Sequence, residues 1–266
     1  MYRREGEDSP PMDEQAIREG LYETPFIQHR ITSGYIRIMD GAHSLPAFWA
    51  HPQIGGSFPG LVLIHSERGL NNQIRIRVRR FAELGYYVIA PELFGATFNT
   101  NDLEICRAAL CKGGDSAVSS ALQVLRTHNR VNRRLGVVGW GAGGEVAFRM
   151  ALTQPDLRAV VIFGGNPQPF LSELHNDQAA ILAFYGDDDP EVTPVMLNQM
   201  WKELAQSKAR WQMIVYPNVA NNFKDEESPR YHPYYAADAW RRCTEFLHEI
   251  LEPPAPTIHL KTDEVT

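Results

Sequence analysis

The stretch Gly139-Trp140-Gly141-Ala142-Gly143-Gly144 follows the apolar run Leu135 to Val138 and precedes a segment with helical periodicity. Its spacing is that of a nucleophile elbow, G-x-S-x-G, in which a sharp turn between a strand and a helix raises a serine above the edge of a parallel sheet. Here the central position is Gly141, which has no side chain that could attack a substrate. The stretch therefore predicts a strand-turn-helix unit of an α/β protein in which the nucleophile is missing.

The elbow lies within a regular alternation of strand-like and helix-like segments. Short apolar runs of the fully buried kind are Gly60 to His65, Tyr86 to Ala90, Leu135 to Val138, Ala159 to Phe163 and Ala180 to Tyr185, and an earlier strand pair, Tyr35 to Met39 and Leu45 to Ala50, flanks Asp40-Gly41. Helices are predicted over Asn72 to Leu84, Ser116 to Thr127 with Asp115 as its N-cap, Gly143 to Thr153, Pro194 to Gln206 and Ala236 to Leu251. This order predicts a doubly wound, mostly parallel sheet with helices on both faces.

One large domain accounts for most of the 266 residues, and a hydrophobic content of 44% is enough for a substantial core. We expect this domain to span residues 26–252. Residues 1–25 are polar and predict a flexible N-terminal extension, and the proline-containing residues 253–266 predict a flexible C-terminal tail. Because only a short segment, Gly164 to Ala179, separates two successive strands, no large cap domain is predicted.

Charge and composition exclude several classes of partner. A net charge of −6 argues against a nucleic-acid surface, which would be basic. One basic cluster alternates with apolar residues, so it is interpreted as a solvated helix face; it consists of Arg75, Arg77, Arg79 and Arg80. No apolar run approaches the roughly 18 residues that a membrane span needs, and no secretory h-region follows the charged N-terminus.

The three cysteines, Cys106, Cys111 and Cys243, have no CxxC spacing and fit a reducing compartment better than a disulfide framework. The sequence therefore predicts a cytoplasmic protein with no metal site and no cofactor. The elbow also matches the dinucleotide pattern G-x-G-x-x-G, but it lies on the fourth or a later strand, whereas that pattern normally follows the first.

Six segments occur in the order and spacing of the dienelactone hydrolase family of α/β-hydrolases, which the chain resembles from Gly34 to Leu251. They are Asp40-Gly41, His65 to Asn71, Gly85 to Gly95, the elbow Gly139 to Gly144, Tyr185 to Asp189, and Tyr216 to Phe223. The resemblance implies an α/β-hydrolase fold. It also implies an ancestry among hydrolases of carboxylic esters or lactones.

The resemblance also implies which positions would carry the chemistry. The nucleophile position is Gly141, the histidine position is Asn221, and the acid position is Asp189, with Asn221 as its expected hydrogen-bond neighbour. Many family members have a glutamate after the third strand; Ser66 occupies that place and Glu67 follows it. Glycine cannot act as a nucleophile and asparagine cannot act as a base near neutral pH, so conventional covalent catalysis at Gly141 is excluded.

The backbone donors of an oxyanion hole do not depend on the missing side chains. In this fold they are the amide after the nucleophile, here Ala142, and an amide in the loop after the third strand, here Glu67. Together with the start of the helix near Gly143, they favour a carboxylate or a polarised carbonyl.

Three functions remain open at this point. The first is a catalytically silent pseudoenzyme with a degenerate triad, which serves as a binding or scaffold protein with a protein partner or a second copy of itself. The second is an active ester or lactone hydrolase that uses Ser66 with His65 or His232. The third is a sensor that binds a small carboxylate or lactone ligand at the amides of Glu67 and Ala142.

Overall fold

The computed structural model describes residues 3–4, 28–94, 100, 102–176, 178–226 and 228–255. Its strands are β1 (Arg3–Arg4), β2 (Ile31–Asp40), β3 (His43–Pro52), β4 (Phe58–Ile64), β5 (Tyr87–Pro91), β6 (Val131–Trp140), β7 (Leu157–Phe163), β8 (Ala180–Gly186) and β9 (Trp211–Tyr216). Its helices are α2 (Asn72–Glu83), α3 (Leu103–Thr127), α4 (Ala142–Thr153), α5 (Pro194–Leu204) and α6 (Pro233–Leu251), with the 3-10 segments η1 (Gln168–Asn176) and η2 (Asn221–Lys224).

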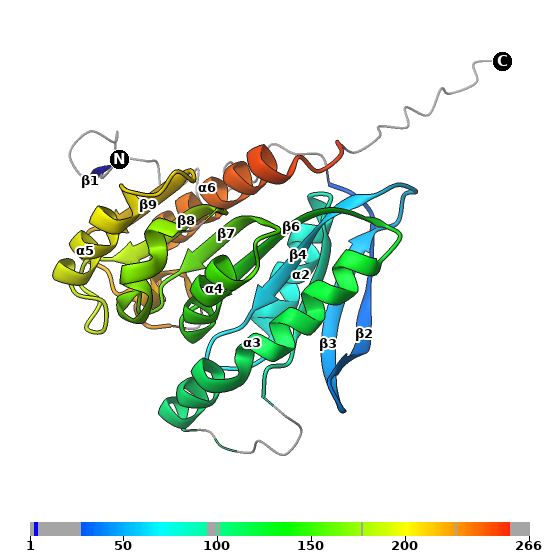
Figure 1. The fold of residues 1–266 in the computed structure, drawn as a ribbon, viewed down its shortest axis with the longest axis horizontal. Helices are drawn as coiled ribbons and strands as arrows, with labels where there is room; N and C mark the ends of the chain where they lie inside the picture. The colour runs from blue at the N-terminus through cyan, green and yellow to red at the C-terminus, as the bar shows by residue number, and fades with distance from the viewer. Residues whose placement is uncertain are drawn as a thin grey trace.

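The strands form one sheet in the order β1-β9-β8-β7-β6-β4-β5-β3-β2 (Figure 1). β3 pairs antiparallel with both β2 and β5, and every other described pair is parallel. The doubly wound, mostly parallel sheet predicted from the sequence is therefore confirmed. The criterion of apolar runs missed β9, because the polar Gln212 interrupts it and only part of the strand is buried.

Helices cover both faces of the sheet (Figure 1). The buried side chains of α3, α4 and α5 pack on one face, and those of α2 and α6 pack on the other. β4 shows the alternation behind this division, since Val62 and Ile64 belong to the first core cluster while Leu61 and Leu63 belong to the second. A strand buried on both faces needs apolar residues at successive positions, which explains the continuous runs in the sequence.

The long helix α3 begins earlier than the sequence predicted. Its N-cap is Asp102, whose carboxylate accepts hydrogen bonds from the Glu104 and Ile105 amides. The predicted N-cap, Asp115, is wrong: it lies inside α3, where its carboxylate accepts a hydrogen bond from Arg149 Nε of α4 at 2.7 Å. A helix continues past an acidic residue when that side chain has a partner on a neighbouring element.

Only a few residues at each end of the chain are among those that the structure describes. Arg3 and Arg4 add a short parallel strand beside β9; the rest of the predicted N-terminal extension up to residue 25, and the predicted tail beyond residue 255, lie outside the described residues. Only η1 occupies the described part of the connection between β7 and β8. None of the described helices combines the length and the apolar character that crossing a bilayer requires.

Candidate ligand site at the carboxyl edge of the sheet

The loops that follow the parallel strands meet around a cavity of about 270 Å³. Ligands of open α/β sheets bind outside the carboxyl ends of the strands, so this is the place where the fold predicts a site. Side chains and turns from several of these loops line the cavity, including Ser66, Glu67, Gly141, Asp189, Asn221 and Lys224. The structure thus brings together the three predicted triad positions, although they come from separate parts of the chain.

The elbow has the strained geometry of a nucleophile turn. Gly141 lies between β6 and α4 with φ of 55° and ψ of −122°, a conformation that suits glycine. The neighbouring glycines are required by packing, because a Cβ on Gly143 would lie 2.3 Å from the His65 carbonyl oxygen. The glycine-rich turn is therefore a close crossing of α4 over the sheet, and Gly141 is its cavity-facing position.

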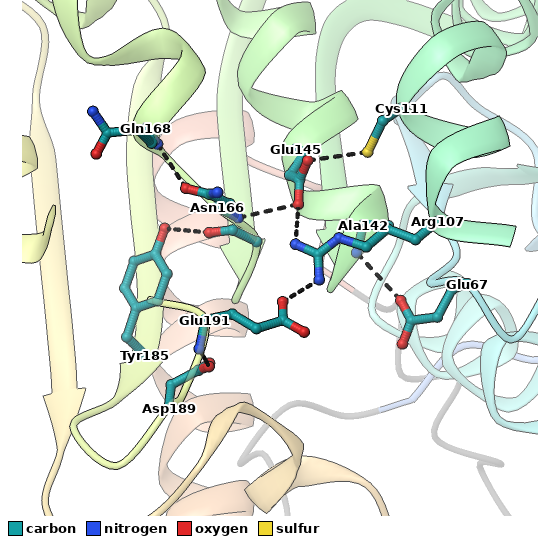
Figure 2. Close-up of polar contacts among 11 residues, drawn as sticks. Glu67, Arg107, Cys111, Ala142, Glu145, Asn166, Gln168, Tyr185, Asp189 and Glu191 are labelled. Atoms are coloured by element: carbon teal, nitrogen blue, oxygen red, sulfur yellow. Dashed lines mark hydrogen bonds and ion pairs between the residues drawn. The ribbon is translucent and has the colours of Figure 1, made fainter. Parts of the chain in front are cut away.

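The carboxylate of Glu67 lies close to the place where a side chain on residue 141 would begin. A Cβ built on Gly141 would be 3.0 Å from Glu67 Oε2 and 3.4 Å from Ser66 Cβ. The Ala142 amide, the expected oxyanion-hole donor, donates a hydrogen bond to Glu67 Oε2 at 3.4 Å (Figure 2). The sequence analysis used only the backbone amide of Glu67, whereas the structure brings its side chain to the start of α4, where a negative charge is favourable.

Asp189 and Asn221 both line the cavity, but each has partners other than the pairing expected from the sequence. Asp189 Oδ1 accepts a hydrogen bond from the Glu191 amide at 2.9 Å, and its buried Oδ2 has no partner among the described residues. Burial raises the pKa of the Asp189 carboxyl. Asn221 Oδ1 accepts a hydrogen bond from Lys224 Nζ at 2.8 Å, so a lysine, which the sequence analysis did not consider, contacts the histidine position.

Among the described residues, Ser66 has no imidazole partner. His65 is fully buried, and both ring nitrogens have protein partners, the Ser66 carbonyl oxygen at 2.7 Å from Nδ1 and the Leu93 amide at 3.0 Å from Nε2. His232 is the N-cap of α6, where its Nδ1 accepts a hydrogen bond from the Tyr235 amide at 3.4 Å. The structure therefore does not assemble the serine-histidine pair that an unconventional hydrolase would require.

Arg107 of α3 lines the cavity and pairs with carboxylates from two other parts of the chain (Figure 2). Its guanidinium donates to Glu145 Oε1 at 2.6 Å and also pairs with the Glu191 carboxylate. Glu145 is buried, and its other oxygen accepts a hydrogen bond from Cys111 Sγ at 3.0 Å. Burial and the neighbouring Glu145 carboxylate raise the pKa of the Cys111 thiol to about 12, so this sulfur stays protonated and is a poor nucleophile.

A second wall is basic. The Arg77 guanidinium of α2 lies 4.9 Å from the centre of the Trp140 ring and donates to Gln73 Oε1 at 3.4 Å. No carboxylate of the described residues lies within ion-pair distance of it. This corrects the interpretation of the arginine cluster as a purely solvated face: Arg77 turns toward the cavity, while the apolar Ile76 beside it is 50% exposed.

Lys224 adds a second basic group to this wall. Its side chain is half-buried and lines the cavity. Burial is the main cause that lowers the pKa of Lys224, to about 7, and the nearby Arg77 guanidinium lowers it further. Its position directly after the segment Tyr216 to Phe223 is the signal that could have revealed it, because that segment already pointed to a strand-end loop.

No group of three or more His, Cys, Asp or Glu side chains in the described part of the chain has an arrangement that could hold a metal ion. The cavity is instead lined by arginine, lysine and carboxylate side chains together with amide groups. These groups can bind and orient a polar ligand. The lining also includes the Ser66 hydroxyl, but position 141 carries a glycine and position 221 an asparagine, where the family pattern has a nucleophile and a histidine.

Comparisons with known proteins place this geometry in context. The model of the dienelactone hydrolase family matches residues 45–251. A protein of Escherichia coli (strain K12) named "Putative carboxymethylenebutenolidase" is 27% identical over 247 residues, covering 86% of this chain and 90% of that protein. The "Probable 2-oxo-3-(5-oxofuran-2-ylidene)propanoate lactonase" of Bradyrhizobium sp is 25% identical over 234 residues, which are 82% of this chain and 94% of that protein.

Solved structures show the same fold. The crystal structure of a "Putative Dienelactone Hydrolase" from Klebsiella pneumoniae subsp. pneumoniae MGH 78578 superposes with a TM-score of 0.76 at 23% identity. The match covers 83% of this chain and 100% of that chain.

Proposed function

Because this chain belongs to the dienelactone hydrolase family, we propose that it is a member without hydrolase activity that binds a small carboxylate or lactone in the cavity beside Gly141. The α/β-hydrolase fold supplies the cavity and the elbow. The side chains that would perform covalent chemistry at positions 141 and 221 are replaced by those of glycine and asparagine.

The observation that carries this proposal is the Glu67 carboxylate beside Gly141. An oxyanion hole accelerates acyl transfer because its amides face a developing negative charge. Here the Ala142 amide already donates to a carboxylate, Glu67 Oε2, at 3.4 Å. A second negative charge beside this carboxylate would be repelled, so the arrangement opposes the transition state of ester hydrolysis even apart from the missing nucleophile.

The open cavity supports ligand binding over a purely structural scaffold. Trp140 lines it without filling it, and Arg77 and Lys224 bring positive charge to one wall. The names of the relatives denote substrates that combine a lactone ring with a carboxylate-bearing substituent. A ligand of this class has the charge that the basic wall attracts.

Catalytic silence is tested with an activated aryl ester. We expect the wild-type protein to hydrolyse p-nitrophenyl acetate no faster than an equal concentration of the Ser66→Ala variant. Turnover by the wild type that the Ser66→Ala, His65→Ala or His232→Ala change abolishes would overturn the proposal in favour of a hydrolase with unconventional residues.

Ligand binding is tested by thermal denaturation with succinate and γ-butyrolactone at millimolar concentrations. A ligand that binds the folded state raises the melting temperature. We expect succinate to stabilise the wild type, and to stabilise Glu67→Gln more because the competing carboxylate is gone. Succinate should no longer stabilise Arg77→Met. It should still stabilise the control variant Arg79→Met, because Arg79 is another arginine of α2 but is stacked on Phe48. No shift with either compound in any variant would count against a binding function.

The expectations of a protein partner or a homo-oligomer, and of a cytoplasmic location, stay predictions.

A further inference from the structure

Lys224 ends the short segment η2, and its side chain lines the cavity. Its Nζ donates hydrogen bonds to two oxygens of the same residue, the Asn221 carbonyl oxygen at 2.6 Å and Asn221 Oδ1 at 2.8 Å. The Phe223 ring centre lies 5.5 Å from Nζ. No carboxylate among residues 178–226, or elsewhere in the described chain, lies within ion-pair distance of this nitrogen.

The two hydrogen bonds leave one position on the nitrogen free. A neutral amine has two N–H groups and one lone pair, and the two oxygens of Asn221 account for both N–H groups. Burial and the Arg77 guanidinium lower the pKa of Lys224 to about 7, while the carboxylates of Glu67, Asp189 and Asp225 act in the opposite direction. A substantial fraction of the amine is therefore neutral near pH 7, and its lone pair is available for a bond to carbon.

The surroundings of this amine favour a ligand with two functional groups. The Arg77 guanidinium, on the same cavity wall, has no carboxylate partner in the described chain and suits a ligand carboxylate. Asp189 lines the same cavity with a buried oxygen, Oδ2, that has no partner in the described chain. The raised pKa of this carboxyl fits it to give and take a proton.

We propose that Lys224 forms a reversible imine with the carbonyl group of a 2-oxo acid whose carboxylate is held by Arg77. This inference rests on the proposed function, because it names the ligand class of that same cavity. The Nζ lone pair forms a bond to the carbonyl carbon, and the carbonyl oxygen takes up the proton that the amine gives up. Asp189 protonates the hydroxyl group of this carbinolamine, the nitrogen lone pair forms the C=N bond as the carbon–oxygen bond breaks and water leaves, and the protonated imine returns its nitrogen proton to the Asp189 carboxylate. The step needs no oxidant or reductant.

The experiment is reductive trapping on the full chain with pyruvate and sodium cyanoborohydride. We expect intact-mass analysis to show one attached pyruvate per chain, and peptide mapping to place it on Lys224. At pH 7 the neutral fraction of an amine with a pKa of about 7 exceeds that of an ordinary lysine by roughly 10³-fold, so labelling of Lys224 should exceed that of the exposed Lys202 by about 10²-fold or more. The labelling rate should rise with pH and level off above about pH 8.

Matched variants separate this reaction from general lysine chemistry. Lys224→Arg keeps the positive charge and should lose the label, whereas Lys202→Arg on the surface of α5 should keep it. Acetone, which lacks the carboxylate, should label Lys224 at least 10-fold more slowly than pyruvate; equal rates would overturn the assignment of Arg77. Labelling spread evenly over the lysines of the wild-type protein would overturn the imine without the need for any variant.

The same compound distinguishes this inference from the function on which it rests. If pyruvate raises the melting temperature of the wild type and Lys224→Arg equally and leaves no label, the cavity binds carboxylates without a covalent bond, and only the imine is refuted. If pyruvate and succinate neither label nor stabilise the wild type, both proposals fail.

Discussion

Gly141 shows how a single residue can keep the geometry of a reactive turn without its chemistry. Its φ of 55° is costly for any residue with a Cβ, and a nucleophile in this position must be held there by the surrounding fold. Glycine removes that strain, and the Glu67 carboxylate lies in the adjacent space. A side chain at position 141 and the Glu67 carboxylate would therefore be in tight contact.

Gly141→Ala should destabilise the protein by about 1–3 kcal/mol, because the new Cβ meets a strained backbone and lies close to Glu67 Oε2. Urea denaturation measures the effect. Gly113→Ala is the matched control: Gly113 lies in helix α3 with nothing within 4 Å of a new Cβ, and the change should stabilise the protein by about 0.5–1 kcal/mol. Equal effects at the two glycines would contradict the strain assigned to the elbow.

Lys224 predicts an unusual dependence of stability on pH. Its pKa is about 7 in the folded protein and near its ordinary value of 10.5 when unfolded. Below pH 7 both states carry the proton, and the folded state bears the full cost of a buried charge. Between pH 7 and pH 10.5 Lys224 is mostly neutral in the folded state and protonated in the unfolded state, so its destabilising contribution falls as the pH rises.

Lys224→Met should therefore stabilise the protein by roughly 1–3 kcal/mol near pH 6, and the gain should shrink toward about pH 10. Urea midpoints at both pH values measure it. Lys202→Met, at an exposed lysine of α5, should show no such trend. A gain from Lys224→Met that is constant with pH would mean that the amine is not perturbed.

At the scale of elements, helices α3 and α4 pack against each other mainly through apolar residues, and an ion pair also joins them beside the cavity. A Cβ on Gly114 of α3 would lie 3.1 Å from Val146 of α4, so the helices cross closely there. About two turns earlier in α3, Arg107 pairs with Glu145 of α4 and with Glu191 in the loop before α5 (Figure 2). This pairing couples three elements that the chain order keeps apart.

Arg107→Met should cost about 2–4 kcal/mol, because it leaves the buried Glu145 carboxylate without its cation. Arg210→Met, which breaks a solvent-screened surface pair with Glu249, should cost much less. Chemical denaturation compares the two, and the double variant Arg107→Met with Glu145→Gln should recover part of the loss. If both single variants cost the same, the Arg107 network has no special role in stability.

The sequence was most informative about elements and least informative about contacts between them. Continuous apolar runs located five strands correctly, β4 to β8, because buried strands have few other solutions, and the turn Asp40-Gly41 located the pair β2 and β3. The start of α3 was missed because Asp102 and Asp115 are equally good caps in isolation, and only the Arg149 pairing decides between them. Family order located Gly141, Asp189 and Asn221 at one cavity, but local patterns could not show that Arg77 turns inward or that Lys224 reaches Asn221.

For the molecule as a whole, the question is whether the hydrolase frame survives around its replaced residues. Asp189, the cavity and the strand-end loops converge as the fold requires, and the Glu67 carboxylate accepts a hydrogen bond from the Ala142 amide. Restoring nucleophile and base alone leaves that amide occupied. Activity should therefore depend on three positions together.

We expect Gly141→Ser with Asn221→His to give little esterase activity, and the addition of Glu67→Ala to raise the rate by roughly 10²-fold, about what one oxyanion-hole donor contributes. Hydrolysis of p-nitrophenyl acetate measures the series, with Glu67→Ala alone as an inactive control. A double variant as active as the triple would show that Glu67 does not block the amide. A triple variant that folds and stays inactive would show that the cavity has been remodelled for binding beyond these three residues, with Lys224, which contacts position 221, the next residue to replace.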